Sequence, residues 1–160
     1  DSYTVTRATA DEFSLVEIGD LANVTSGVTL GGPAELEQRP YGPTGLAETY
    51  SVDVTFAATG DTTVEELIAG TVTVANVFTA DPIIQTEDLV VLEDPKGLFL
   101  ASNVIPVVSV DVADEIADVI NAVNAKLTPE ALVALNVQST VDKLAPAAIA
   151  TQFLEDNNLN

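Results

Sequence analysis

The strongest constraint on the fold of this chain is a change of pattern along its length. Through about the first hundred residues, short runs rich in β-branched residues alternate with helical patterns, which is typical of a layered α/β architecture. Strands are expected near residues 3–7, 28–30, 52–57, 71–78 and 89–92, with 103–110 as a further extended run. Beyond residue 110 the pattern predicts helices alone.

Capping residues predict where the helices of the first part begin and end. Thr9 with Glu12 has the spacing of a capping box, and Thr63 with Glu66 repeats that spacing. Gly70 is expected to end the second of these helices, because glycine readily adopts the left-handed conformation found just beyond helix ends.

Three helices are expected to close the chain. Asp111 is positioned to cap the first, whose apolar face we expect to be buried: Val112, Ile116, Val119, Ile120 and Val123. Thr128 followed by Pro129 reads as the N-cap and first residue of the next helix, and Pro146 opens the last. No stretch approaches the roughly 20 apolar residues of a membrane-spanning helix.

Composition restricts the chemistry. The chain has 25 acidic and 5 basic residues, a formal net charge of −20, and no Cys, His, Met or Trp. Nucleic acid is not an expected partner, because its binding depends on clustered Lys and Arg, and a cationic or zwitterionic ligand fits better. The alternative is that the acidic surface only maintains solubility.

Without His or Cys, the common nucleophile systems and zinc sites are excluded. We expect no catalytic residue, no metal and no cofactor. Adjacent acidic pairs such as Glu93-Asp94 lack the spacing of a calcium loop and are interpreted as solvated surface. An enzyme that uses carboxylates alone remains a rival, which would need two acids with raised pKa in one pocket.

Two kinds of residue could bind a cationic or zwitterionic ligand. Arg39, one of two arginines, lies in a predicted loop where its guanidinium could hold a carboxylate, or could form a surface ion pair with Glu35 or Glu37. Phe78 and Tyr3 lie at predicted strand ends, where aromatic faces could attract a quaternary ammonium group. Core packing is the alternative for either ring.

Several motifs, in order along nearly the whole chain, resemble those of the solute-binding proteins of ABC importers for glycine betaine and choline osmoprotectants. They are Asp1-Ser2-Tyr3, Gly31-Gly32-Pro33, Arg39-Pro40-Tyr41, Thr63-Val64-Glu65-Glu66-Leu67, Phe78-Thr79-Ala80-Asp81-Pro82, residues 89–99 and residues 103–108.

The resemblance implies an α/β lobe of a type II periplasmic-binding-protein fold, with a mixed central sheet flanked by helices. Residues 1–104 would be the second lobe, and residues 105–160 would return across the hinge as helices that pack on a first lobe upstream of Asp1, missing from this chain. If that lobe is absent, the exposed helices would need another partner, such as a second copy of the chain in a homo-oligomer.

The resemblance also implies roles for individual residues. Arg39 would hold the ligand carboxylate, while Asp1, Tyr3 and Phe78 would contribute to a cage around the ammonium group. Asp81 would lie at the ligand side, and Ser102 takes a position where several relatives carry an aromatic residue, which implies a thinner cage.

The expected function is therefore that of an exported, extracytoplasmic binding protein, periplasmic or a cell-surface lipoprotein. It would capture a quaternary ammonium or zwitterionic solute for an ABC permease, without catalysis. Alternatives are a sensor or interaction module derived from the same fold, and a binding protein for a different small solute.

Overall fold

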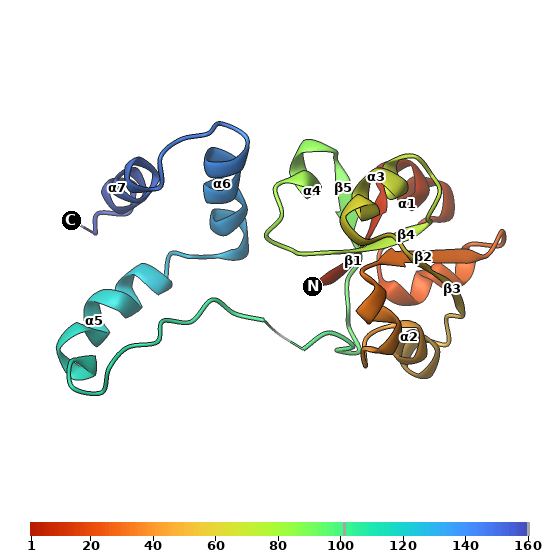
Figure 1. Ribbon diagram of the computed structural model, residues 1–160, viewed down its shortest axis with the longest axis horizontal. Helices are drawn as coiled ribbons and strands as arrows, with labels where there is room; N and C mark the ends of the chain where they lie inside the picture. The colour runs from red at the N-terminus through yellow and green to blue at the C-terminus, as the bar shows by residue number, and fades with distance from the viewer. Residues whose placement is uncertain (101, 160) are drawn as a thin grey trace. The chain divides into compact units, whose positions relative to one another are not determined.

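A computed structural model describes residues 1–100 and 102–159 (Figure 1). Backbone contacts divide the chain into two compact units. The sheet unit comprises Asp1–Thr79 and Ile83–Ala101, and the helical unit comprises Ala80–Pro82 and Ser102–Asn160. The predicted boundary between residues 104 and 105, which would separate the second lobe from the helices that return to a first lobe, stays a prediction.

Five strands of the described residues form one mixed sheet in the order β3-β2-β4-β1-β5. Their bounds are β1 Ser2–Thr6, β2 Val28–Gly32, β3 Val54–Ala58, β4 Val74–Val77 and β5 Leu89–Val91. Strand β2 runs parallel to β3 and β4, whereas β1 is antiparallel to β4 and β5. The predicted α/β class with a mixed sheet is confirmed, and each of the five predicted strand ranges overlaps an observed strand.

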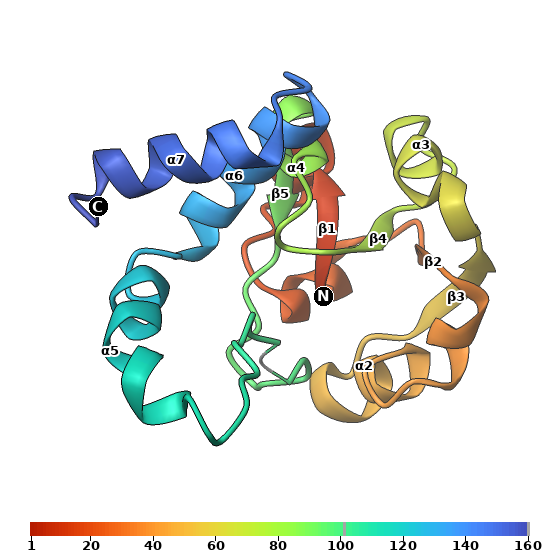
Figure 2. The ribbon, with the colours of Figure 1, turned by 60° about the vertical axis from the view of Figure 1, so that its left-hand side comes forward.

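Short helices connect the strands of the sheet unit. They are α1 Arg7–Phe13, η1 Ile18–Asn23, η2 Ala34–Gln38, α2 Pro43–Tyr50, η3 Gly60–Thr62, α3 Thr63–Ile68 and α4 Ile83–Thr86. Figures 1 and 2 show α2 and α3 on opposite sides of the part of the sheet that contains β2 and β3.

The two faces of the sheet bury two separate clusters, because neighbouring residues of a strand point to opposite faces. In β4, Val74 joins a cluster with Leu46 of α2, whereas the next residue, Ala75, joins a cluster with Leu67 of α3. The near-continuous apolar character of β4 follows from this burial on both faces.

The predicted capping boxes are wrong in detail. The N-cap of α1 is Thr6, three residues before the predicted cap, and its hydroxyl accepts a hydrogen bond from the Thr9 N–H at 3.1 Å. Strand β1 runs directly into this helix, so the cap must be the last residue with extended backbone. Thr63 begins α3, but its hydroxyl donates to the Gly60 carbonyl instead of capping. The end of that helix at Gly70, which has φ of 75°, is confirmed.

The three predicted helices of the helical unit are confirmed as α5 Ala113–Asn124, α6 Pro129–Thr140 and α7 Pro146–Asp156. Thr128 caps α6 by accepting a hydrogen bond from the Ala131 N–H at 3.2 Å. The predicted cap of α5 is wrong: its N-cap is Val112, and the N–H of Asp111 donates to the Ser109 hydroxyl.

The predicted burial of the apolar face of α5 is not found. No residue of α5 is buried, and Val119 is 68% exposed. The run 103–110 forms no strand among the described residues and is exposed throughout. A strand needs a hydrogen-bonding neighbour, and the described residues supply none for this run. The apolar face of α5 is covered only in part, because Ile116, Ile120 and Val123 are half-buried. No helix among the described residues has the length and apolar character needed to cross a membrane.

Candidate functional site

A cavity of about 250 Å³ lies at one edge of the sheet unit. It is lined by Asp1, Pro33, Glu35, Leu36, Arg39, Tyr41, Asn76 and Phe78. The topology explains why residues so far apart in sequence meet. Strands β2 and β4 are parallel, so Pro33 and Phe78 follow their ends at the same edge, and Asp1 precedes the antiparallel β1 at that edge. The carboxyl ends of parallel strands are where open α/β sheets bind ligands.

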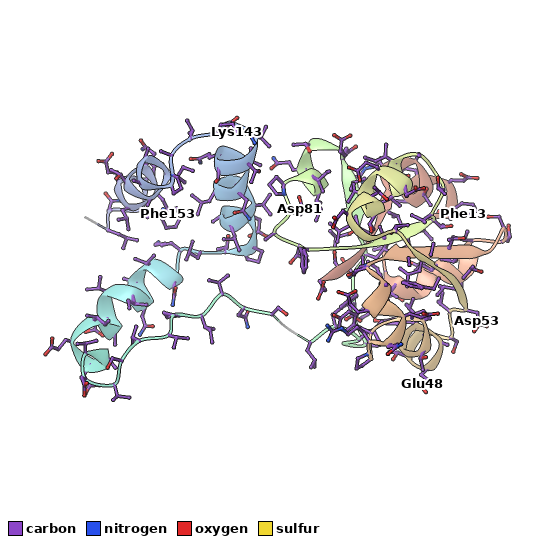
Figure 3. All side chains as sticks on the ribbon, viewed as in Figure 1. Phe13, Glu48, Asp53, Asp81, Lys143 and Phe153 are labelled. Carbon is purple, nitrogen blue, oxygen red and sulfur yellow. The ribbon has the colours of Figure 1, made fainter. Side chains whose placement is uncertain are left out.

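Three of the six predicted site residues, Asp1, Arg39 and Phe78, line this cavity. Asp81, labelled in Figure 3, lies between β4 and α4 in the stretch Ala80–Pro82, which belongs to the helical unit together with Ser102. The ligand contacts predicted for Asp81 and Ser102 stay predictions.

Tyr3 is placed behind the cavity. Its side chain is fully buried, its hydroxyl donates a hydrogen bond to the backbone carbonyl of Tyr41, and its ring meets Phe99 edge to face at a centroid distance of 4.9 Å. Burial, with a smaller contribution from Tyr41, raises the pKa of the Tyr3 phenol well above its ordinary value. Tyr3 thus supports Tyr41, which lines the cavity. The predicted contact of Tyr3 itself with a ligand stays a prediction.

Arg39 follows η2 with its side chain exposed. The backbone on either side is held by hydrogen bonds from the Arg39 N–H to Leu36 and from the Gly42 N–H to Arg39, at 3.1 and 2.9 Å. Neither alternative partner, Glu35 or Glu37, forms an ion pair with the guanidinium, and it makes no hydrogen bond within the part of the chain that the structure describes. The guanidinium is therefore available to an anionic group at the cavity.

Aromatic and polar side chains complete the wall. Phe78 is 68% exposed, an unusual state for a large apolar ring immediately after a buried strand. The Asn76 amide donates to the Ser2 carbonyl at 3.2 Å. Among the lining residues that our prediction omitted, Tyr41 lay inside the Arg39-Pro40-Tyr41 motif, and Asn76 was a polar residue inside an apolar run. These two sequence features could have identified Tyr41 and Asn76 as lining residues.

Asp94 corrects the interpretation of the acidic pairs as solvated surface. Its carboxylate accepts hydrogen bonds from the Leu98 and Phe99 N–H groups at 3.0 and 2.8 Å and from the Tyr50 hydroxyl at 2.5 Å. Partial burial by itself would raise the pKa of Asp94, but these hydrogen bonds to the charged form outweigh it and lower the pKa below its ordinary value. Burial, followed by the hydrogen bond to Asp94, raises the pKa of Tyr50 to about 12.

An acid-dependent stability follows from the lowered pKa of Asp94. A carboxyl group with a lower pKa in the folded state stabilises the fold above its unfolded-state pKa, and this contribution is lost as the pH falls through the folded-state value. We expect Asp94→Asn to lower the melting temperature at neutral pH and the difference from the parent chain to shrink below about pH 4. Thermal unfolding followed by circular dichroism against pH measures this, and a difference that stays constant down to pH 2 would contradict it.

The fold is that of an α/β lobe with a cavity at one end of its mixed sheet. Over residues 1–156 the chain matches the family described as the substrate binding domain of ABC-type glycine betaine transport system, and it belongs to that family. No curated protein matches the chain. Substrate-binding domains of ABC transporters bind solutes without converting them, so the chain is not an enzyme, and binding proteins of this family are extracytoplasmic.

Two solved structures show the same fold. A crystal structure of a glycine betaine/carnitine/choline ABC transporter has a TM-score of 0.86 and 24% identity, with 99% of this chain and 59% of that chain covered. Apo YehZ from Escherichia coli has a TM-score of 0.74 and 23% identity, with 99% of this chain and 62% of that chain covered. This chain thus spans less than two thirds of the length of either structure.

Proposed function

We propose that this chain is one lobe of an exported binding protein that captures a quaternary ammonium osmoprotectant, of the glycine betaine or choline class, and delivers it to an ABC permease. The proposal depends on one observation: Arg39 and the exposed ring of Phe78 line the same cavity. The Arg39 guanidinium has no partner among the described residues.

The chemistry of the lining suits such a solute. Arg39 presents a planar fork that can hold a carboxylate through two parallel hydrogen bonds. The faces of Phe78 and Tyr41 can attract a quaternary ammonium group, at about 0.5–2 kcal/mol for each ring depending on its desolvation. Asp1 and Glu35 place two carboxylates at the same cavity and favour positive charge there.

A second lobe would complete the site. The solved relatives are longer than this chain, and a cage for a trimethylammonium group needs faces on several sides of it. Contacts of Tyr3, Asp81 and Ser102 with the solute are part of this proposal. Closure of the lobes would present the loaded protein to the permease. The exposed faces of the helical unit would pack on the other lobe or, in its absence, on a second copy of the chain.

A ligand panel tests the proposal. We expect glycine betaine, choline and carnitine to shift the NMR signals of cavity residues saturably when titrated into the isotope-labelled chain. The matched control is the neutral carbon analogue of choline, in which a tert-butyl group replaces the trimethylammonium group and abolishes the attraction to the rings and carboxylates. Equal responses to choline and to this analogue, or no response to any of the three solutes, would contradict the proposal.

A further inference from the structure

The ring of Tyr41, which lines the cavity, rests on a second aromatic ring that does not line it. The Tyr41 and Phe99 ring centroids are 5.1 Å apart with the ring planes tilted by 40°, and Phe99 also packs against the buried Tyr3. The Tyr3 hydroxyl in turn donates to the Tyr41 carbonyl. The orientation of Tyr41 therefore depends on where Phe99 is held.

Phe99 is held by the turn that precedes it. The carboxylate of Asp94 accepts hydrogen bonds from the N–H groups of Leu98 and Phe99, and the Gly97 N–H donates to the Asp94 carbonyl at 3.2 Å. Gly97 has φ of 68°, a left-handed conformation that suits glycine. The Asp94 carboxylate thus stabilises the turn of residues 94–99 by accepting hydrogen bonds from the backbone of the turn itself.

Tyr50, at the end of α2, fixes that carboxylate. Its hydroxyl donates to Asp94 at 2.5 Å and accepts from the Lys96 N–H at 2.9 Å, and the residue is 6% exposed. The ammonium group of Lys96 lies 4.8 Å from the ring centroid of Tyr50 and donates to the Thr49 carbonyl at 2.9 Å. The turn is therefore attached to α2 by both its backbone and its side chains.

We propose that Tyr50 and Asp94 are positioning residues for recognition of the ammonium group of the solute. They hold the turn of residues 94–99 so that Phe99 fixes the ring of Tyr41 at the cavity wall. The inference rests on the function proposed above. It concerns the aromatic side of the cavity in particular, because the backbone at Arg39 is held by the separate hydrogen bonds to Leu36 and from Gly42.

Two variants and a control test this role. Tyr50→Phe removes only a hydroxyl and keeps the buried ring, and Asp94→Asn removes the charged acceptor. Glu93→Gln is the matched control, because it removes the same charge one residue earlier from an exposed side chain with no hydrogen bond among the described residues. Each variant is titrated by NMR with choline and, separately, with acetate, which carries only the carboxylate group that Arg39 would bind. All titrations are made well below the melting temperature of the variant.

We expect both Tyr50→Phe and Asp94→Asn to raise the dissociation constant for choline roughly 2- to 30-fold, the range for residues that act on a site through others. The response of the Arg39 side-chain signals to acetate should stay within error, and Glu93→Gln should match the parent chain for both probes. A general loosening of the fold would weaken both probes alike, so this split separates positioning from simple structural support.

The outcomes separate the two proposals. If the parent chain binds choline and Tyr50→Phe binds it equally well, the positioning role is wrong and the proposed function stands. Parallel loss of choline and acetate binding in Tyr50→Phe also overturns the positioning role. If the parent chain binds neither probe, the proposed function itself fails and the positioning role fails with it.

Discussion

Replacing Gly45 with alanine is expected to lower the free energy of unfolding by about 3 kcal/mol or more. Gly45 lies inside α2, where glycine to alanine ordinarily stabilises a helix by about 1 kcal/mol. Here a Cβ atom would lie 1.9 Å from the Pro40 carbonyl oxygen and 2.9 Å from the Leu98 Cδ1 atom. The nearest atom belongs to the backbone, which cannot rotate away as a side chain can, so the segment containing Pro40 would have to move.

Urea unfolding followed by circular dichroism measures the effect. Thr44→Ala is the control, because it changes the neighbouring, exposed position of the same helix and should alter stability by no more than about 0.5 kcal/mol. A Gly45→Ala chain as stable as the parent would show that the segment around Pro40 yields easily. In that case the loop that carries Arg39 would not be rigidly placed at the cavity.

Replacing Arg39 with alanine should weaken glycine betaine binding roughly 10- to 100-fold, as expected for the loss of about 1.5–3 kcal/mol of hydrogen bonding to a charged group. Choline has no carboxylate, so its affinity should not fall. Stability should change by no more than about 0.5 kcal/mol, because the Arg39 side chain makes no hydrogen bond or ion pair within the described chain.

Arg7→Ala provides the matched control for Arg39→Ala. It removes the other arginine, which is exposed and paired with Asp88 at 3.2 Å, and so makes the same change in net charge. Calorimetry or NMR titration of both variants with glycine betaine and choline decides the outcome. Equal losses in the two variants would mean that only the net charge of the chain matters, and a matching loss of choline affinity in Arg39→Ala would place the ammonium group beside the guanidinium.

Local patterns predicted much of the fold because the features involved depend on nearby residues. The Thr128-Pro129 start of α6 and the Gly70 end of α3 depend on backbone conformations that the residue type itself favours. The cap of α1 was misplaced because Thr6 and Thr9 are chemically equivalent candidates. The choice depends on where β1 stops pairing with β5, which is a tertiary property.

Part of the candidate site could also be predicted from local features of the sequence. Arg39 and Phe78 were identifiable because a rare cation in a loop and an aromatic ring at a strand end are unusual in this sequence. The support given by Asp94 was missed, because an acidic pair in sequence has the same appearance whether it faces water or closes a turn. Its three hydrogen bonds come from residues 4, 5 and 44 positions away.

The sequence by itself determined the α/β class, the helical character of its last part and the absence of His and Cys chemistry, because these follow from periodicity and composition. Only the tertiary structure decided which side chains share the cavity. The parallel pairing of β2 with β4 and the antiparallel entry of β1 bring residues 1, 33 and 78 to one edge of the sheet. Strand order and direction are set by packing on both faces of the sheet, which no local stretch of sequence encodes.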